Sequence, residues 1–310
     1  MNCQKYTIGL TWIWRKLMRE KVTFFTTNSF LTVLLAFLTT QQLYATSPSF
    51  QGLGYMPRSW LWSEATGISA DGTTVVGSGI FYHPLGGTYN QGFRWTVAGG
   101  LESFDSDEAT LDEIPHDVSA DGSVVVGSPA YRWTQAEGGT LLGLIPGGSG
   151  THGSTARAVS DDGAVVAGES EGTFQWREAF RWTQGTGMVG LGYLGLPSQG
   201  SSFALGISGD GSVIVGTSPY SGDSEFRWTE ENGMVGLGAG SIQSPDASYD
   251  GSVIVGYGSF GASSGSNEAF RWTEKSGPVG LGDLPGGGFR SQAYAVSADG
   301  SIVVGSSETA

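Results

Sequence analysis

The densest group of potential ligand oxygens lies in residues 102–117, which read ESFDSDEATLDEIPHD. Seven Asp and Glu side chains occur in this segment, and Ca²⁺ prefers oxygen ligands of this kind. Their spacing does not follow the ligand positions of an EF-hand loop. We therefore expect the acidic loop 102–117 to be solvated, and calcium binding stays open as the alternative.

Other residue types that support catalysis lack the arrangement that catalysis needs. The three histidines, His83, His116 and His152, are far apart, and we expect them in surface loops rather than in a zinc site. Residues 168–172 and 261–265 match the Gly-x-Ser-x-Gly pattern of a serine nucleophile, but no His follows either serine. The sequence therefore predicts no catalytic residue, no cofactor-binding residue and no metal ligand, and we expect a protein that is not an enzyme.

Asp and Arg recur at fixed places in two repeated motifs. The motif [Val/Ile]-Ser-x-Asp-Gly-x-x-[Val/Ile]-Val-Gly occurs six times with small departures, at intervals of 40 to 50 residues, and [Phe/Tyr]-Arg-Trp-Thr occurs five times. The repeated Arg could pair with the repeated Asp, stack on Trp or form a ring of ligand sites, and we expect a structural role. These signature residues are Asp71, Asp121, Asp162, Asp210, Asp250, Asp299, Arg94, Trp95, Arg132, Trp133, Arg181, Trp182, Arg227, Trp228, Arg271 and Trp272.

Each motif predicts short strands joined by tight turns. The Asp-Gly pair lies between two β-branched runs, which is typical of a hairpin whose glycine has a positive φ. In Phe-Arg-Trp-Thr, Phe and Trp share one face of a strand, and a third motif, Gly-Leu-Gly-x-x-Pro, predicts a thinner strand and a turn. Four strands in about 46 residues match the period of a propeller blade.

The strands that carry the repeated Asp, Arg and Trp residues therefore predict an all-β fold. We predict a β-propeller of about six four-stranded repeats, in a single domain at residues 46–310. The sixth Asp-Gly hairpin has no Arg-Trp strand after it, so we expect an incomplete last blade and a chain truncated at Ala310. An open β-solenoid of stacked hairpins is the alternative.

Composition excludes several classes of protein. The 310 residues include 52 Gly, but there is no three-residue period, which excludes a collagen-like chain. Aromatic residues make up 12%, more than a disordered polar tract contains. Acidic residues outnumber basic ones 29 to 15, so no basic surface for nucleic acid is expected.

The first 45 residues have the order of a secretory signal peptide. A basic stretch precedes the apolar run at residues 30–38, and a small residue, Ala45, ends the segment. The apolar run is too short to span a bilayer, and Met18 is an alternative start. We predict a signal peptide at 1–45, no transmembrane segment in the mature chain, and a secreted, periplasmic or cell-surface location. The only cysteine, Cys3, lies in the signal.

Taken together, the three motifs resemble the HAF-family extracellular repeats of bacteria. The combination of AFRWT, GLGDLPGG and AVSADGSIVVG in residues 269–305 carries the resemblance most clearly. The chain departs from the family at the His that gives it its name, because no copy has His before Phe-Arg-Trp or Tyr-Arg-Trp. The resemblance implies an exported repeat protein.

From location, repetition and the missing catalytic constellation, we expect a non-catalytic binding or interaction module at the cell surface or outside the cell. Its partner would be an extracellular glycan or protein. The alternative is a carbohydrate-active hydrolase on a propeller scaffold, whose loop carboxylates supply the acid and the base. A pair of buried carboxylates in one central cleft would favour the hydrolase, and equivalent shallow pockets around the ring would favour a multivalent binder.

Overall fold

Strands and the turns between them make up the described part of the chain. The computed structural model describes residues 52–54, 60–82, 87–104, 113–148, 150, 153–173, 176–195, 200–219, 224–238, 242–258 and 267–309. The described strands all belong to one unit, Leu53–Ala310. The predicted signal peptide lies outside the described residues, as do residues 105–112 of the acidic segment.

The strands follow the predicted repeats. The first two sheets hold β1 (Trp60–Ile68), β2 (Thr74–Tyr82), β3 (Thr88–Thr96), β4 (Gly100–Ser103), and β5 (Ile114–Val118), β6 (Val124–Ser128), β7 (Tyr131–Thr134), β8 (Gly138–Leu141). The next two hold β9 (Ser154–Val159), β10 (Val165–Glu171), β11 (Arg177–Thr183), β12 (Gly187–Gly190), and β13 (Phe203–Ile207), β14 (Val213–Thr217), β15 (Glu225–Thr229), β16 (Gly233–Gly236). The last two hold β17 (Ile242–Ala247), β18 (Val253–Gly258), β19 (Glu268–Thr273), β20 (Gly277–Gly282), and β21 (Gly286–Val296), β22 (Val303–Thr309).

Each sheet is an antiparallel meander. Five sheets have four strands paired in chain order, and the last described sheet has two, β21 and β22. In each complete sheet the Arg-Trp strand is the third strand, and it pairs with the Val-Val-Gly strand before it, as Val215 pairs with Arg227. The all-β prediction with about six repeats and an incomplete last repeat is confirmed.

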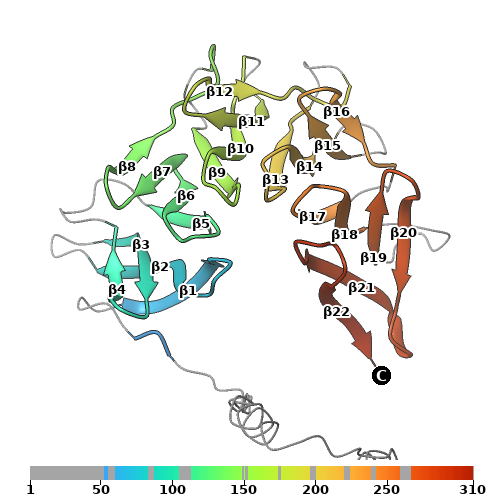
Figure 1. Cartoon of the computed structure of the whole chain (residues 1–310), viewed down its shortest axis with the longest axis horizontal. Helices are drawn as coiled ribbons and strands as arrows, with labels where there is room; N and C mark the ends of the chain where they lie inside the picture. Colours follow the sequence, from blue (N-terminus) through green and yellow to red (C-terminus); the bar gives the residue numbers. More distant parts are fainter. Residues whose placement is uncertain are drawn as a thin grey trace, which may run out of the picture. The chain divides into compact units, whose positions relative to one another are not determined.

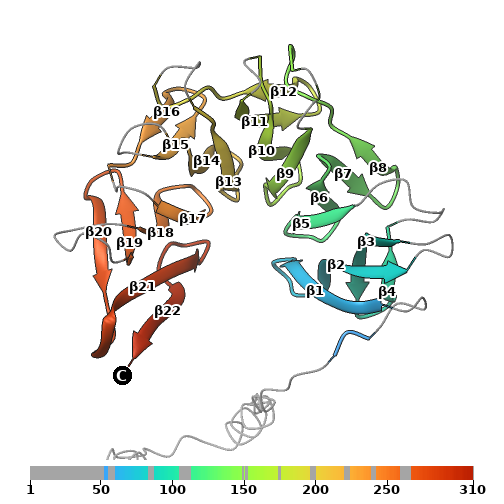
Figure 2. The same cartoon turned by 180° about the vertical axis from the view of Figure 1, so that it is seen from behind.

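Successive sheets are arranged with their first strands on the inside. The first strands contact one another in the order β1, β5, β9, β13, β17 and β21, and the fourth strands lie on the outer side (Figures 1 and 2). This radial order is that of a β-propeller and differs from the linear stack of a solenoid. Among the described strands, β21–β22 and β1–β4 make no comparable contact with each other, so the series of sheets is open.

The repeated hairpin between the first and second strands is closed by side chains. Ser208 Oγ donates to Asp210 Oδ1 over 2.6 Å, and the Ser212 N–H donates to the same oxygen over 2.9 Å. The Val213 N–H donates to Ser208 Oγ over 2.9 Å, while Gly211 has a φ of +71°. The Ser–Asp bond recurs in each of the six hairpins, so the repeated Asp caps its own turn.

Backbone hydrogen bonds link each hairpin to the next. The five links share one geometry, in which an N–H of one turn donates to a carbonyl oxygen of the following turn over 2.9 to 3.0 Å. They run from Ala70 to Ala120, Ala120 to Asp161, Asp161 to Gly209, Asp210 to Tyr249 and Tyr249 to Ala298. The links fix the distance between neighbouring sheets at the ends of their first strands.

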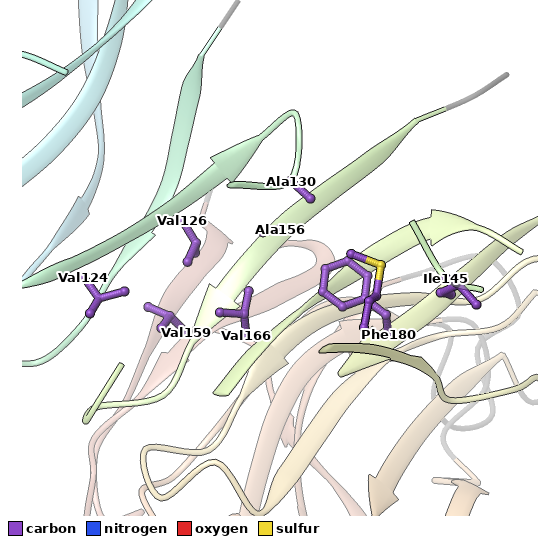
Figure 3. Packing of buried hydrophobic residues seen from close by; sticks show 9 residues of the cluster. Val124, Val126, Ala130, Ile145, Ala156, Val159, Val166 and Phe180 are labelled. Atoms are coloured by element: carbon purple, nitrogen blue, oxygen red, sulfur yellow. The ribbon is translucent and has the colours of Figure 1, made fainter. Parts of the chain in front are cut away.

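The apolar core lies between sheets. Val124 and Val126 of one sheet pack with Val159, Val166 and Phe180 of the next (Figure 3). Similar clusters join each later pair of neighbouring sheets. Stability therefore comes from neighbour-to-neighbour burial, as in other repeat proteins.

Candidate functional site

A β-bulge at the same place in every first strand creates the candidate site. The pairing of each first strand with its second strand shifts just before the [Val/Ile]-Ser motif, or Ala-Ser in the fifth sheet, and leaves one or two residues unpaired. A bulge re-aims side chains and is common beside functional sites. The bulged residues are Thr66, His116, Arg157, Leu205, Pro245 with its neighbour Ser244, and Tyr294.

The sequence does not repeat at the bulged positions. The bulge carries Thr, His, Arg, Leu, Pro and Tyr in turn, and the residue after it is Gly, Asp, Ala, Gly, Asp and Ala, whereas the [Val/Ile]-Ser or Ala-Ser pair that follows repeats. A scaffold requirement would act equally on every copy. The divergence at one structurally equivalent position therefore shows that the shared backbone does not restrict this position to one type of residue.

Five of the bulged residues, all but Thr66 and Ser244, line one cavity along the inner strands, which we call the channel cavity. The cavity has a volume of about 420 Å³, within the range of small-ligand sites. Its walls come from β5, β9, β13, β17 and β21, which Figure 1 shows on the inner side of their sheets. The lining residues are His116, Asp117, Arg157, Ala158, Leu205, Gly206, Ile207, Pro245, Asp246 and Tyr294.

Two carboxylates face this cavity from different sheets. Asp117 of β5 accepts hydrogen bonds from its neighbour Val118 N–H over 2.8 Å and from Val159 N–H of β9 over 2.9 Å. Asp246 of β17 likewise accepts from Val296 N–H of β21 over 2.8 Å. Each carboxylate therefore joins two neighbouring first strands and is held in a fixed position.

Arg157 is paired inside its own sheet. Its Nε and Nη2 atoms donate to the two carboxylate oxygens of Glu169, each over 2.6 Å. Glu169 is 3% exposed and Arg157 is 37% exposed, so the charged end of the Arg side chain reaches the cavity while its partner is buried. The bidentate geometry fixes the guanidinium.

Two other bulged residues make the same kind of pair with the second strand. His116 Nε2 lies 2.8 Å from Ser128 Oγ, and the Tyr294 hydroxyl lies 3.1 Å from Ser306 Oγ. Ser128, Glu169 and Ser306 occupy equivalent positions, directly after the glycine of the Val-Gly or Ala-Gly pair. Three of the bulged side chains, those of His116, Arg157 and Tyr294, are thus paired with the second strand of their own sheet.

Burial shifts the titration of the groups in the cavity. Burial raises the pKa of Asp117 to about 7, although two backbone N–H groups act in the opposite direction, and the charge of Asp246 adds to the rise. Burial also raises the pKa of Asp246. The pKa of His116 is lowered, first by burial and then by the charge of Arg157, so the imidazole is neutral at pH 7.

These shifts predict how stability depends on pH. Between about pH 4 and pH 7 the folded chain binds more protons than the unfolded chain at Asp117, so the free energy of unfolding should fall as pH rises. Below about pH 4 the carboxylates of the hairpins have the opposite effect on the free energy of unfolding. The hydrogen bond from Ser297 lowers the pKa of Asp299 to about 2, so the free energy of unfolding should fall as pH falls through this range.

We expect Asp117→Asn to flatten the fall between about pH 4 and pH 7, measured by urea denaturation at several pH values. The lowered pKa of His116 acts in the opposite direction, so the comparison is the difference between variant and parent. Glu274→Gln, in the exposed turn after β19, is the matched control and should keep the parental profile. If the pH profile of Asp117→Asn equals that of the parent, the fall in stability does not come from a raised pKa of Asp117.

Arg132, Arg227 and Arg271 contact the following sheet, whereas Arg94 Nη2 donates to Thr74 Oγ1 of its own sheet over 3.4 Å. Arg132 Nε donates to the Gly163 carbonyl oxygen over 3.4 Å, and Arg271 Nη2 donates to the Gly300 carbonyl oxygen over 3.5 Å. Arg227 lies over the ring of Trp272, 5.9 Å from its centroid. The ion pairs found between described residues include none between a repeated Arg and a repeated Asp.

A second cavity does involve the repeated residues. It has a volume of about 270 Å³ and is lined by Arg181, Arg227 and Trp228 with Asp250 and the Gly211 turn. It is therefore made of signature positions, unlike the channel cavity. A ring of such sites stays a prediction.

The sequence interpretation missed the cavity residues. His116 was expected in a surface loop and Asp117 in a solvated acidic segment, and both expectations are wrong: the two residues lie in β5 and face the channel cavity. Alignment of the six hairpin motifs carries the signal, because the two columns before [Val/Ile]-Ser, or before Ala-Ser in the fifth copy, do not repeat and contain His116, Asp117 and Arg157.

Within the described residues, no group of three or more His, Cys, Asp or Glu side chains is placed to hold a metal ion. The same part of the chain contains no helix long and apolar enough to cross a membrane.

The fold and the cavity together define a β-propeller whose inner strands line a channel with non-repeated side chains. No family model matches the chain, and no curated protein matches it. Among solved structures it is similar to TolB from Acinetobacter baumannii, with 13% identity and a TM-score of 0.46, covering 75% of this chain and 57% of that one. It is also similar to a putative TolB from Agrobacterium tumefaciens, with 15% identity and a TM-score of 0.43, covering 84% and 73%. At these values nothing about the function of this chain follows.

Proposed function

We propose that this chain is an exported, non-catalytic binding module of the HAF repeat type, and that its ligand binds in the channel cavity. The observation that carries the proposal is the bulged position, where repeated backbone presents a different side chain from each sheet. The secretory pattern of residues 1–45 and the motif resemblance support export. A glycan or an extracellular protein is the partner.

Blocking the cavity tests the proposal. Leu205 lies in the cavity wall at a bulge, so Leu205→Trp should fill the cavity without removing a hydrogen bond. The matched control is Val235→Trp, on the outer strand β16, where the parental side chain is 52% exposed. On a glycan array, we expect Leu205→Trp to weaken the bound signals at least about tenfold, or 1.4 kcal/mol, and Val235→Trp to leave them unchanged.

Melting temperatures of both variants check that the fold is intact. Array signals that survive in Leu205→Trp would contradict the channel as the binding site. Equal loss in both variants would do so as well, because it would point to a general effect of adding Trp.

One observation favours a second candidate, a hydrolase. Asp117 and Asp246 line the same cavity, and burial raises the pKa of Asp117 to about 7, a suitable value for a general acid. Against it, backbone N–H groups already occupy oxygen atoms of both carboxylates. Release of reducing ends from a polysaccharide, abolished by Asp117→Asn and by Asp246→Asn, would favour the hydrolase over the binding module.

A further inference from the structure

Two fixed carboxylates face the channel cavity, and the nearby cationic side chain is already in use. Arg157 binds Glu169 through two hydrogen bonds of 2.6 Å. The ion pairs formed by described residues include neither Asp117 nor Asp246. Asp117 and Asp246 are half-buried, and a partly desolvated carboxylate without a cation is destabilised.

We propose that the channel cavity binds a ligand carrying a primary ammonium group, with Asp117 and Asp246 as the acceptors. The inference rests on the proposed function, because it names the chemistry of the ligand that the cavity takes. The two residues lie in β5 and β17, in the second and the fifth sheet, yet both line one cavity of about 420 Å³. The charge of Asp246 acts on Asp117, which fits carboxylates that share one space.

The carboxylates have acceptor capacity to spare. An ionised carboxylate offers about four lone-pair sites, and Asp117 uses two of them for the Val118 and Val159 N–H groups. Because these bonds fix the oxygens, the carboxylate cannot turn away to solvent, and a donor must come to it. A primary ammonium group has three N–H donors, which suits two carboxylates better than a neutral hydroxyl does.

The rest of the cavity wall suits the body of such a ligand. Leu205 of β13 and Pro245 of β17 supply an apolar surface in the cavity wall. Tyr294 is 47% exposed, and its ring meets Tyr257 edge to face at 5.9 Å, so the ring is held in place. A ligand with one ammonium group on a body of sugar or amino-acid size therefore fits the charge and the volume.

The ammonium group could belong to an amino sugar or to a lysine side chain, and the probes separate these sources. Binding is measured by calorimetry with glucosamine tetramer, its fully N-acetylated form, tetralysine and its ε-acetylated form, each on the whole purified protein. We expect a free amine to bind at least about tenfold more tightly than its acetylated partner, since acetylation removes the charge. If the difference appears with glucosamine tetramer, the ammonium group belongs to an amino sugar. If it appears with tetralysine, the group belongs to a lysine side chain.

Variants connect the amine to the two carboxylates. Asp246→Asn should weaken amine binding at least about tenfold, whereas Glu274→Gln, which removes an exposed carboxylate of the turn after β19, should not. Asp246→Asn keeps an oxygen for the Val296 N–H, and its melting temperature shows whether the fold survives. If Asp246→Asn fails to fold, Asp117→Asn takes its place.

The outcomes separate this inference from the proposed function. Binding that Leu205→Trp removes but that acetylation leaves unchanged keeps the channel as the site and overturns the ammonium ligand. Amine binding that Leu205→Trp and Asp246→Asn leave intact overturns both. No heat from either free amine at about 10 mM, where a millimolar complex would be detected, also overturns the ammonium ligand.

Discussion

The variant Gly216→Ala is expected to lose about 3 kcal/mol or more of unfolding free energy, beyond the usual cost of an overpacked core. A Cβ at Gly216 would lie 2.0 Å from the Phe203 carbonyl oxygen, 2.8 Å from Phe226 Cζ and 2.9 Å from Ala204 Cα. Two of these atoms are backbone of the adjacent first strand, so no rotamer change relieves the clash. Chemical denaturation of parent and variant measures the loss.

The control for this prediction is Gly185→Ala, in the exposed turn between β11 and β12. A Cβ there meets nothing within 4 Å, and its φ lies outside the left-handed region. We expect a change within about 0.5 kcal/mol. Similar losses in the two variants would show that the close approach of the strands at Gly216 is not what makes glycine necessary. The same clash, at 1.9 to 2.1 Å, occurs at Gly77, Gly127, Gly168 and Gly305.

The variant Arg157→Ala is expected to lose about 3 kcal/mol, because it leaves the buried Glu169 carboxylate without its cation. The parental pair has two hydrogen bonds of 2.6 Å, and Glu169 is 3% exposed. Water therefore replaces the guanidinium poorly. The double variant Arg157→Met with Glu169→Gln should recover most of the loss, since no buried charge is then unpaired.

Arg290→Ala provides the matched comparison. Arg290 and Glu308 form a single contact of 3.3 Å, and their side chains are 63% and 49% exposed. We expect a loss of about 1 kcal/mol or less, as for other exposed ion pairs. If Arg157→Ala costs no more than Arg290→Ala in the same denaturation assay, the pair at Glu169 is not the buried anchor that its geometry indicates.

Much of the fold could be predicted from the sequence because its determinants are local. The Ser-x-Asp-Gly turn needs a serine, an aspartate and a glycine within four residues, and all six copies form the same hydrogen bonds. Strand alternation in Phe-Arg-Trp-Thr and the 40-to-50-residue spacing then lead to four-stranded sheets in series. The lack of an Arg-Trp strand after the sixth hairpin predicted the two-stranded last sheet.

The role of the repeated Arg could be predicted only in part. Its structural alternatives were pairing with Asp and stacking on Trp. The structure places Arg227 over Trp272, and it places Arg132 and Arg271 against carbonyl oxygens of the next hairpin. The carbonyl partner belongs to the following repeat, and the distance between two sheets is set by packing that no single motif encodes.

The sequence by itself determined the repeat, the hairpin, the strand order and the all-β class, because each depends on residues within one copy. Only the tertiary structure decided the candidate site. His116, Asp117 and Arg157 come together with Pro245, Asp246 and Tyr294 because the sheets turn about one axis and bulges at one repeat position point toward it. Asp117 ends an acidic run and lies inside, since its environment comes from β9 and β17 rather than from its neighbours in the chain.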